Sequence, residues 1–104
     1  MRRVHIHEAA SREAIEAAAW YELKRPGLGA EFQRPIETAL DLLSEDVVPL
    51  TPAHSAAKMR GVKRLILKRF PFDVAVVDRP TEVFVIAFAH HARRPGYWRQ
   101  RRRE

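Results

Sequence analysis

Seven consecutive apolar residues, VFVIAFA at positions 83–89, constrain the fold of this chain more than any other stretch. Successive side chains of a strand point to opposite faces of its sheet, so a strand built from this run is apolar on both faces. Such a strand has to lie inside a sheet whose two faces are both covered. The sequence therefore predicts a central strand over about 82–90.

Three more strands are expected from the pattern of apolar residues. Residues 61–68 and 72–78 are rich in Val, Leu and Ile, and the turn sequences RFP and DRPT separate them from each other and from the central strand. At the N-terminus, residues 2–7 alternate between polar and apolar and predict a short strand. In the strand over 61–68, the side chains of Arg64 and Lys68 share one face.

A first helix is predicted over residues 11–24, SREAIEAAAWYELK. Ser11 is a suitable N-cap, and basic residues occupy the last turn. We expect Trp20 and Tyr21 to belong to the core, as aromatic residues beside apolar neighbours usually do. Four apolar residues fall on one side at helical spacing and are expected to face the core: Ile15, Ala18, Ala19 and Leu23.

A second helix is predicted over about 28–45. Its apolar stripe consists of Leu28, Phe32, Ile36, Ala39, Leu40 and Leu43. Pro35 lies too deep for a first-turn proline, so we expect either a kink there or a later start of the helix. The connection RPGLG is short, which predicts that the two helices form an antiparallel hairpin.

The elements combine into an α+β fold of order β-α-α-β-β-β over a single domain, residues 1–104. The N-terminal strand joins a mainly antiparallel four-stranded sheet, and the helical hairpin packs on one face of it to bury its apolar side. Residues 46–59 are expected to be a loop. We expect the other sheet face to stay open, and a basic C-terminal tail to follow the last strand.

Several classes of protein are excluded by what the sequence lacks. It contains no cysteine, so disulfides, thiolate nucleophiles and cysteine-based zinc sites are excluded. It has no apolar run of about 18 residues for a membrane helix, and no apolar run after its N-terminal basic pair for a signal peptide. It has no GxGxxG, Walker or HExxH motif. We therefore expect a cytoplasmic protein with no cofactor, no metal and no membrane partner.

Positive charge is concentrated in the second half of the chain. Residues 1–57 contain six Lys/Arg and nine Asp/Glu, whereas residues 58–104 contain thirteen Lys/Arg and four Asp/Glu. Such asymmetry favours an anionic partner for the second half. Basic and aromatic side chains near the last strands are the target-binding candidates: Arg64, Lys68, Arg69, Arg93, Arg94, Tyr97, Arg99 and Arg101.

Three features near the ends of the chain have alternative interpretations. His5, His7 and the His90–His91 pair would bind zinc or nickel only if their strands were adjacent, and solvated histidines are the commoner outcome. His90 would equally be a core histidine, since it extends the strand face of Phe84, Ile86 and Phe88. Trp98 is expected to pack on the sheet, whereas residues 101–103 are expected to be frayed and solvated.

The chain resembles the RelE/ParE superfamily, the toxins of bacterial type II toxin–antitoxin modules, also known as plasmid stabilisation proteins. The resemblance extends from Val4 to about Arg101 and is carried by four stretches in order: AAAWYE, RPGLGAEF, RLILKRFPFDVAVV and VIAFAHHARRPGYWRQR. It implies a helical hairpin on an antiparallel sheet, in agreement with the pattern of elements. It also implies a cognate antitoxin whose C-terminal segment wraps the toxin.

The resemblance implies one of two activities. RelE-like toxins cut mRNA on the ribosome with basic residues on the second strand, an arginine early in the third, an arginine at the end of the fourth and a later tyrosine. Arg64, His91 and Tyr97 match these positions, but Ile66 and Asp73 depart from them. Arg69 and Arg93 are the candidates to supply the missing charge, which completes the nuclease set.

ParE-like toxins inhibit DNA gyrase and require a binding surface instead of a catalytic constellation. Asp73 stands in place of the arginine of the nucleases, and its negative charge would repel a scissile phosphate. Loss of such an electrostatic donor reduces the rate of the catalysed reaction by about 10²–10³. The sequence therefore favours a ParE-like gyrase inhibitor. A ribosome-dependent mRNA endonuclease is the alternative, and a non-toxic basic nucleic-acid-binding module is a second alternative.

Overall fold

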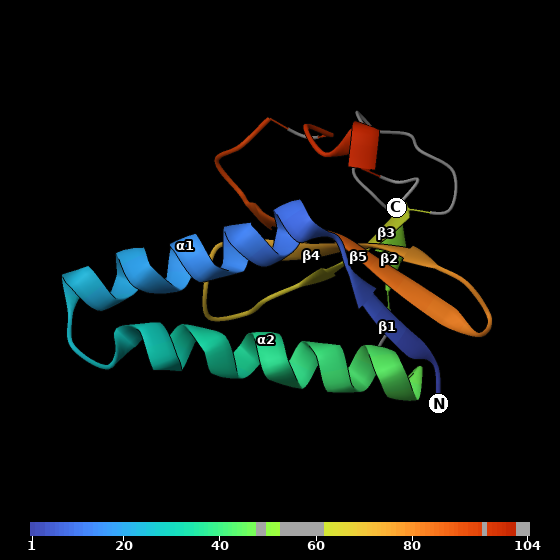
Figure 1. Ribbon diagram of the computed structural model, residues 1–104, viewed down its shortest axis with the longest axis horizontal. Coiled ribbons are helices and arrows are strands. Elements are labelled where there is room, and N and C mark those ends of the chain that lie inside the picture. The colour runs from blue at the N-terminus through green and yellow to red at the C-terminus, as the bar shows by residue number, and fades with distance from the viewer. Residues whose placement is uncertain (48–49, 53–61, 95, 102–104) are drawn as a thin grey trace.

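The structure is a computed structural model that describes residues 1–47, 50–52, 62–94 and 96–101. Its elements are β1 (Arg3–Ile6), α1 (Glu8–Lys24), α2 (Leu28–Glu45), β2 (Thr51–Pro52), β3 (Val62–Ile66), β4 (Phe72–Asp78), β5 (Glu82–His90) and the 3₁₀ helix η1 (Arg99–Arg101). The strands form one sheet in the order β1-β5-β4-β3-β2. The α+β fold with its N-terminal strand, helical hairpin and later strands is confirmed (Figure 1).

The sheet is antiparallel apart from one pair. β1 runs parallel to β5, and the other neighbouring strands are antiparallel. β5 lies between β1 and β4, so the apolar run is an interior strand as predicted. The two-residue β2 extends the sheet within the stretch predicted as a loop, of which residues 48–49 and 53–59 lie outside the described residues.

Helix α1 begins earlier than predicted and presents a different face to the core. His7, and not Ser11, is its N-cap: the His7 imidazole accepts a hydrogen bond from the Ala9 amide at 2.9 Å. The side that packs inward consists of small residues and one tyrosine: Ala10, Ala14, Ala17, Ala18 and Tyr21. Of the predicted face, Ala18 is confirmed as buried, whereas Ala19 is exposed, Ile15 is 65% exposed and Leu23 is 85% exposed, so the prediction is wrong for these three.

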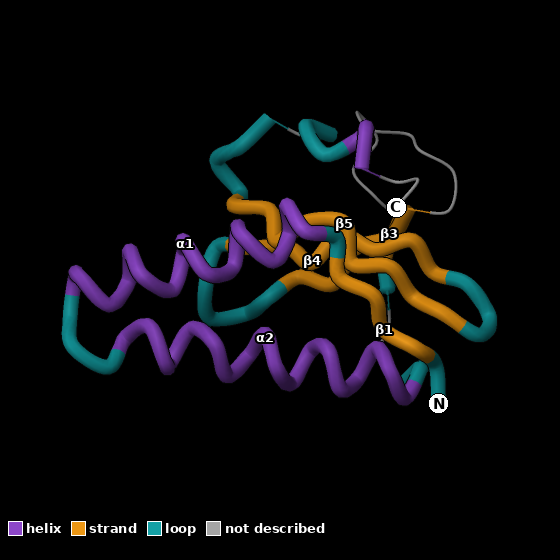
Figure 2. The backbone as a smooth tube through the Cα atoms, in the orientation of Figure 1, coloured by secondary structure: helices purple, strands orange, loops and turns teal. Residues whose placement is uncertain are grey.

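Small side chains let the two helices approach closely. A Cβ atom added at Gly29 would lie 2.7 Å from the Ala18 carbonyl oxygen, so only glycine fits there. The Glu22 carboxylate fixes the connection by accepting hydrogen bonds from the amides of Gly27, at 2.9 Å, and Gly29, at 3.0 Å. The helices consequently form the predicted antiparallel hairpin (Figure 2).

Helix α2 buries the stripe that the sequence predicts. Four members are buried, and the other two pack against the same cluster: Phe32, Ile36, Ala39 and Leu43, then Leu28 and Leu40. The helix continues through Pro35, so the expected later start is wrong. It ends at Glu45, and its C-cap, Asp46, has a left-handed backbone with φ 58°.

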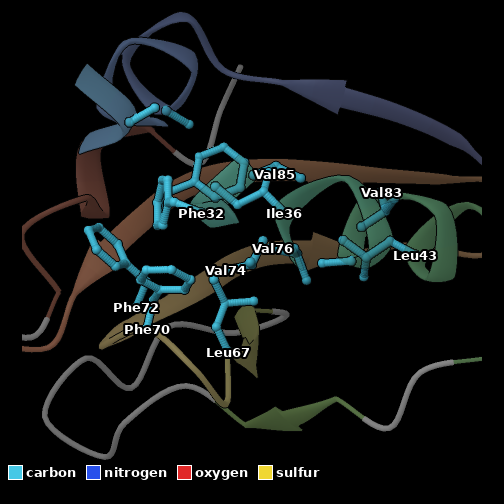
Figure 3. Packing of buried hydrophobic residues seen from close by; sticks show 14 residues of the cluster. Phe32, Ile36, Leu43, Leu67, Phe70, Phe72, Val74, Val76, Val83 and Val85 are labelled. Atoms are coloured by element: carbon cyan, nitrogen blue, oxygen red, sulfur yellow. The ribbon is translucent and has the colours of Figure 1, made fainter. Parts of the chain in front are cut away.

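The main core lies between the hairpin and the sheet and is rich in aromatic rings (Figure 3). Phe32 lies 5.1 Å from both Phe70 and Phe72, measured between ring centroids. Tyr21 packs on the same group, at 5.0 Å from Phe70, as predicted. Trp20 does not, and its predicted place in the core is wrong because 55% of it is exposed.

A β-bulge in β5 changes which side chains face the hairpin. Ala75 pairs with Ala87 and the next residue, Val76, pairs with Val85, which leaves Ile86 as an extra residue. Ile86 therefore packs with the far cluster, whereas Phe88 belongs to the main core. Phe84 and Ile86 therefore share a face as predicted, and the prediction is wrong for Phe88, which the bulge turns towards the main core.

The second sheet face is covered in part by the C-terminal segment. Trp98 is 7% exposed and packs with Val62, Ala75, Val77, Ile86 and Ala87. Gly96, with φ 80°, makes the turn that brings this segment back over the sheet, on the opposite side from the hairpin (Figure 1). The predicted packing of Trp98 is confirmed, and the expectation of an open face is wrong where Trp98 lies.

A buried arginine ties the N-terminus to the far ends of α2 and β4. The Arg2 guanidinium pairs with Asp78 and donates to the Leu43 carbonyl oxygen at 2.8 Å. Burial alone would raise the pKa of Asp78, but hydrogen bonds from Arg2 and Lys63 outweigh it and lower that pKa.

Neither helix of the described chain is both long and apolar enough to cross a membrane.

Candidate target-binding surface

A pocket of about 330 Å³ opens on the second sheet face, beside the C-terminal segment. Its apolar lining includes Ile66, Ala75, Ala89 and Trp98, which come from three strands and the segment after β5. Its charged and polar lining consists of Arg64, Asp73, His90, His91, Arg93, Arg94 and Tyr97. An apolar base with a few convergent polar groups is the usual composition of a ligand site.

Asp73 is the acidic residue that lines this pocket, and two neighbours contact it. Its carboxylate accepts a hydrogen bond from Arg64 Nη1 at 3.3 Å and lies 2.8 Å from His91 Nε2. The Asp73 side chain is 15% exposed, so these contacts are partly shielded from water. The carboxylate offsets the positive charge of Arg64, and it fixes the orientation of the His91 ring.

Glu13 of α1 is the centre of a second polar network. Its carboxylate accepts hydrogen bonds from the Tyr97 hydroxyl at 2.7 Å and from the Phe88 amide at 3.1 Å. Arg101 and Arg93 also pair with it, at 3.0 and 3.4 Å. Because the Glu13 side chain is only 15% exposed, this network joins the first helix to the C-terminal segment in a shielded position.

Two guanidinium groups contact the ring of Tyr97. Arg93 stacks on its ring at 3.7 Å from the centroid, and Arg101 lies at 5.2 Å. Burial, and then the neighbouring Glu13 carboxylate, raise the pKa of Tyr97. A tyrosine that holds its proton this strongly and donates it to a carboxylate is poorly suited to accept a proton from a substrate.

The Glu13 network also provides hydrogen-bond partners for backbone groups at the exposed edge of β5. β1 ends at Ile6, which pairs with Val85, so β5 continues beyond its neighbour. Beyond that point Arg101 Nη1 donates to the Ile86 carbonyl oxygen at 3.2 Å, and Glu13 accepts from the Phe88 amide. Arg101 is therefore held in place, and the expectation that it is frayed is wrong; residues 102 and 103 lie outside the described chain.

The predicted target-binding residues do not all gather in one patch. Arg64, Arg93, Arg94 and Tyr97 line the pocket, and Arg101 contacts the edge of β5 beside it. Arg69 instead pairs with Glu31 at the hairpin end and stacks on Phe70. Lys68 is exposed outside the pocket lining, and Arg99 Nε donates to the Gly96 carbonyl oxygen. The nuclease set is therefore divided, with Arg69 apart from the other members.

Sequence reasoning missed Glu13, which holds the C-terminal segment. Glu13 and Tyr97 are 84 positions apart, and no local pattern links them. Asp73 was recognised as a departure from the nuclease pattern, but its contact with His91 depends on the close approach of β4 to the end of β5.

The histidines considered as metal ligands have other contacts. His5 Nε2 lies 2.9 Å from the Glu82 carboxylate, His7 caps α1, and His90 packs edge-to-face on Phe72 at 5.0 Å. Within the part of the chain that the structure describes, no group of three His, Asp or Glu side chains converges as a metal ion would require.

The fold is similar to that of a chain in the solved structure of the chromosomal ParDE TA system from P. aeruginosa. The likeness has a TM-score of 0.71 at 16% sequence identity, and it covers 86% of this chain and 96% of the other. No protein-family model and no curated protein matches the sequence. The similarity therefore establishes a shared fold.

Proposed function

We propose that this chain is the toxin of a type II toxin–antitoxin module, acts in the cytoplasm and inhibits DNA gyrase by binding it in the ParE manner. The likeness to a chain of the ParDE TA system over most of both chains supports the toxin assignment. A basic second half and a pocket rimmed by arginines support an anionic target or partner.

The contacts of Asp73 are the observation that favours a binding toxin over a nuclease. Its carboxylate accepts from Arg64 and contacts His91, so an anion is present where a nuclease would stabilise negative charge on the phosphate. Tyr97 is engaged with Glu13 and has a raised pKa. A gyrase inhibitor needs none of these groups for chemistry, only a surface of cations and aromatic rings.

The surface that contacts the target is proposed to be the rim of the pocket. Arg94 is exposed and lines the pocket, and His91 lies beside it. Arg93 is less suitable as a probe because it stacks on Tyr97 and pairs with Glu13, so its removal also disturbs the C-terminal segment.

The antitoxin is proposed to neutralise the protein with a segment that carries both acidic and apolar residues. Its acidic side chains would meet the arginines of the rim, and its apolar side chains would fill the base formed by Ile66, Ala75 and Ala89. A short open reading frame encoding such a protein beside this gene would agree with the proposal.

A ribosome-dependent mRNA endonuclease is the second candidate. The contact between His91 and Asp73 favours it, because a carboxylate that orients an imidazole is a common arrangement for general acid–base catalysis. Arg64, Arg93 and Arg94 would then contact the phosphodiester backbone.

Induced expression in bacteria, followed by assays on purified protein, tests these proposals. We expect growth arrest, inhibition of gyrase supercoiling and intact transcripts in translating ribosomes. Arg94→Glu is expected to weaken gyrase inhibition at least tenfold. Arg34→Glu makes the same charge change on the exposed surface of α2 and is expected to have no effect.

Each contrary result has a distinct meaning. Transcript cleavage at A-site codons with supercoiling unaffected would replace the gyrase proposal with the nuclease. Cells that grow normally would indicate a non-toxic nucleic-acid-binding module and refute the toxin assignment.

A further inference from the structure

Two carboxylates lie among the arginines in and beside the pocket on the second sheet face, and both are held in place by the fold. The Asp73 carboxylate accepts a hydrogen bond from Arg64 Nη1 at 3.3 Å and lies 2.8 Å from His91 Nε2. The Glu13 carboxylate pairs with Arg101 at 3.0 Å. Both acidic side chains are only 15% exposed, so solvent screens their charges less than it screens those of an exposed ion pair.

These carboxylates reduce the positive charge that is available at this surface. Glu13 also pairs with Arg93, at 3.4 Å, so three of the four arginines here have an acidic partner within the chain. The fourth, Arg94, is exposed, lines the pocket and forms no ion pair with another described residue. Four arginines against two carboxylates leave a formal charge of +2, where the arginines alone would give +4.

We propose that Asp73 and Glu13 are specificity-determining residues, whose carboxylates keep this surface from binding nucleic acid and leave it selective for a protein segment. A nucleic acid gains most of its affinity when cationic side chains neutralise a run of phosphates and the condensed counterions are released. Arginines that already have a carboxylate partner in the same chain contribute little to this exchange, and the carboxylates themselves repel phosphates. Such a repulsive element is a common source of specificity.

The net charge of the whole chain leads to the opposite expectation. A chain with a net charge of +6, and with its excess of Lys/Arg in residues 58–104, would bind nucleic acid if charge alone decided. In the structure, the carboxylate that opposes Arg93 and Arg101 comes from Glu13, in the acidic half of the chain. The first half of the chain thus lowers the affinity of the basic second half for phosphates.

A protein segment does not need the paired arginines. One acidic side chain would pair with Arg94, and an apolar side chain would fill the base formed by Ile66, Ala75 and Ala89. The inference deepens the proposed function by naming protein, and not DNA or RNA, as the class of partner at this surface. It rests on that function only in taking the pocket as the contact surface.

Fluorescence anisotropy of a labelled DNA duplex of about 20 base pairs, titrated with the purified chain between about 50 and 300 mM NaCl, tests the inference. Each phosphate neutralised adds about −0.9 to the slope of log K against log salt concentration, so we expect a slope no steeper than about −2. Asp73→Asn and Glu13→Gln keep a hydrogen-bond acceptor but remove the charge. Each is expected to steepen the slope by about one and to tighten binding about eightfold near 100 mM salt. Glu37→Gln makes the same charge change on the exposed surface of α2 and is expected to alter the affinity by less than about twofold.

A parent slope of about −4 or steeper would overturn the inference, because all four arginines would then be available to phosphates. So would Asp73→Asn and Glu13→Gln variants that are folded by circular dichroism and bind the duplex no more tightly than Glu37→Gln. If one of the two variants is unfolded, the other decides. A parent chain that leaves gyrase supercoiling unaffected refutes the proposed gyrase inhibition instead, and the duplex measurements still decide the role of the two carboxylates.

Discussion

Replacing Glu13 by alanine tests the network that ties the C-terminal segment to the fold. The change removes the acceptor for the Tyr97 hydroxyl and for the Phe88 amide, and it leaves Arg101 without its carboxylate partner. The Glu13 side chain is 15% exposed, so water replaces these interactions only in part.

The expected loss of stability follows from the kinds of interaction removed. A hydrogen bond to a charged group contributes about 1.5–3 kcal/mol, and Glu13 makes two at good distances. Arg93 adds little because its side chain is 53% exposed. Breaking a shielded ion pair by removing one partner costs about 3–5 kcal/mol, so we expect a loss of about 3–4 kcal/mol in the free energy of unfolding.

Urea and thermal unfolding followed by circular dichroism measure this loss. In a domain of this size each kcal/mol lowers Tm by about 4–8 °C, so Glu13→Ala is expected to lower Tm by more than 10 °C. Glu13→Gln keeps the shape and can still accept a hydrogen bond, so its loss is expected to be about half as large. Glu37→Ala, on the exposed face of α2, is the control and is expected to stay within about 0.5 kcal/mol of the parent.

Hydrogen exchange adds a local measurement to the global one. The amides of η1 and of Phe88 are expected to lose protection in Glu13→Ala before those of β4. If Glu13→Ala unfolds within about 0.5 kcal/mol of the parent chain and η1 keeps its protection, the reasoning is refuted.

Three further predictions follow from buried groups. Because the pKa of Tyr97 is raised in the folded protein, its hydroxyl ionises at lower pH in the unfolded chain, and stability is expected to fall as the pH rises above 10.0. Tyr97→Phe is expected to make that decline less steep, as measured by urea unfolding at each pH. The lowered pKa of Asp78 means that its stabilisation is lost as the pH falls below 3.8, so Asp78→Asn is expected to reduce the acid slope, and an unchanged slope would contradict the role of Arg2. Trp98→Ala is expected to cost about 3 kcal/mol and to make the C-terminal segment sensitive to protease, and equal protease resistance would count against its packing.

Elements with a strong local pattern were predictable from the sequence. The α2 stripe and the interior strand β5 are set by spacing and by a continuous apolar run, which any compact fold has to bury. The short RPGLG connection determined the hairpin in the same way. In α1, alanines occur on every side of the helix, so spacing alone did not identify the buried side. The side with small residues is buried because the two helices pack closely where Gly29 meets Ala18.

Among the candidate site residues, the sequence identified the types of side chain but not all of their positions. Arg64, Arg93, Arg94 and Tyr97 were expected together and line one pocket. Arg69 was expected with them, but it follows β3 and pairs with Glu31 at the hairpin end.

The sequence by itself determined the order of elements, the hairpin, the interior strand and the concentration of positive charge in the second half, because each depends on neighbours in the chain. Only the tertiary structure decided how that charge is offset. Glu13 holds Tyr97 and Arg101 across more than 80 positions, Asp73 contacts His91 across 18, and the bulge at Ile86 sets which side chains of β5 face the hairpin. These contacts depend on strand register and helix placement, which no local pattern encodes.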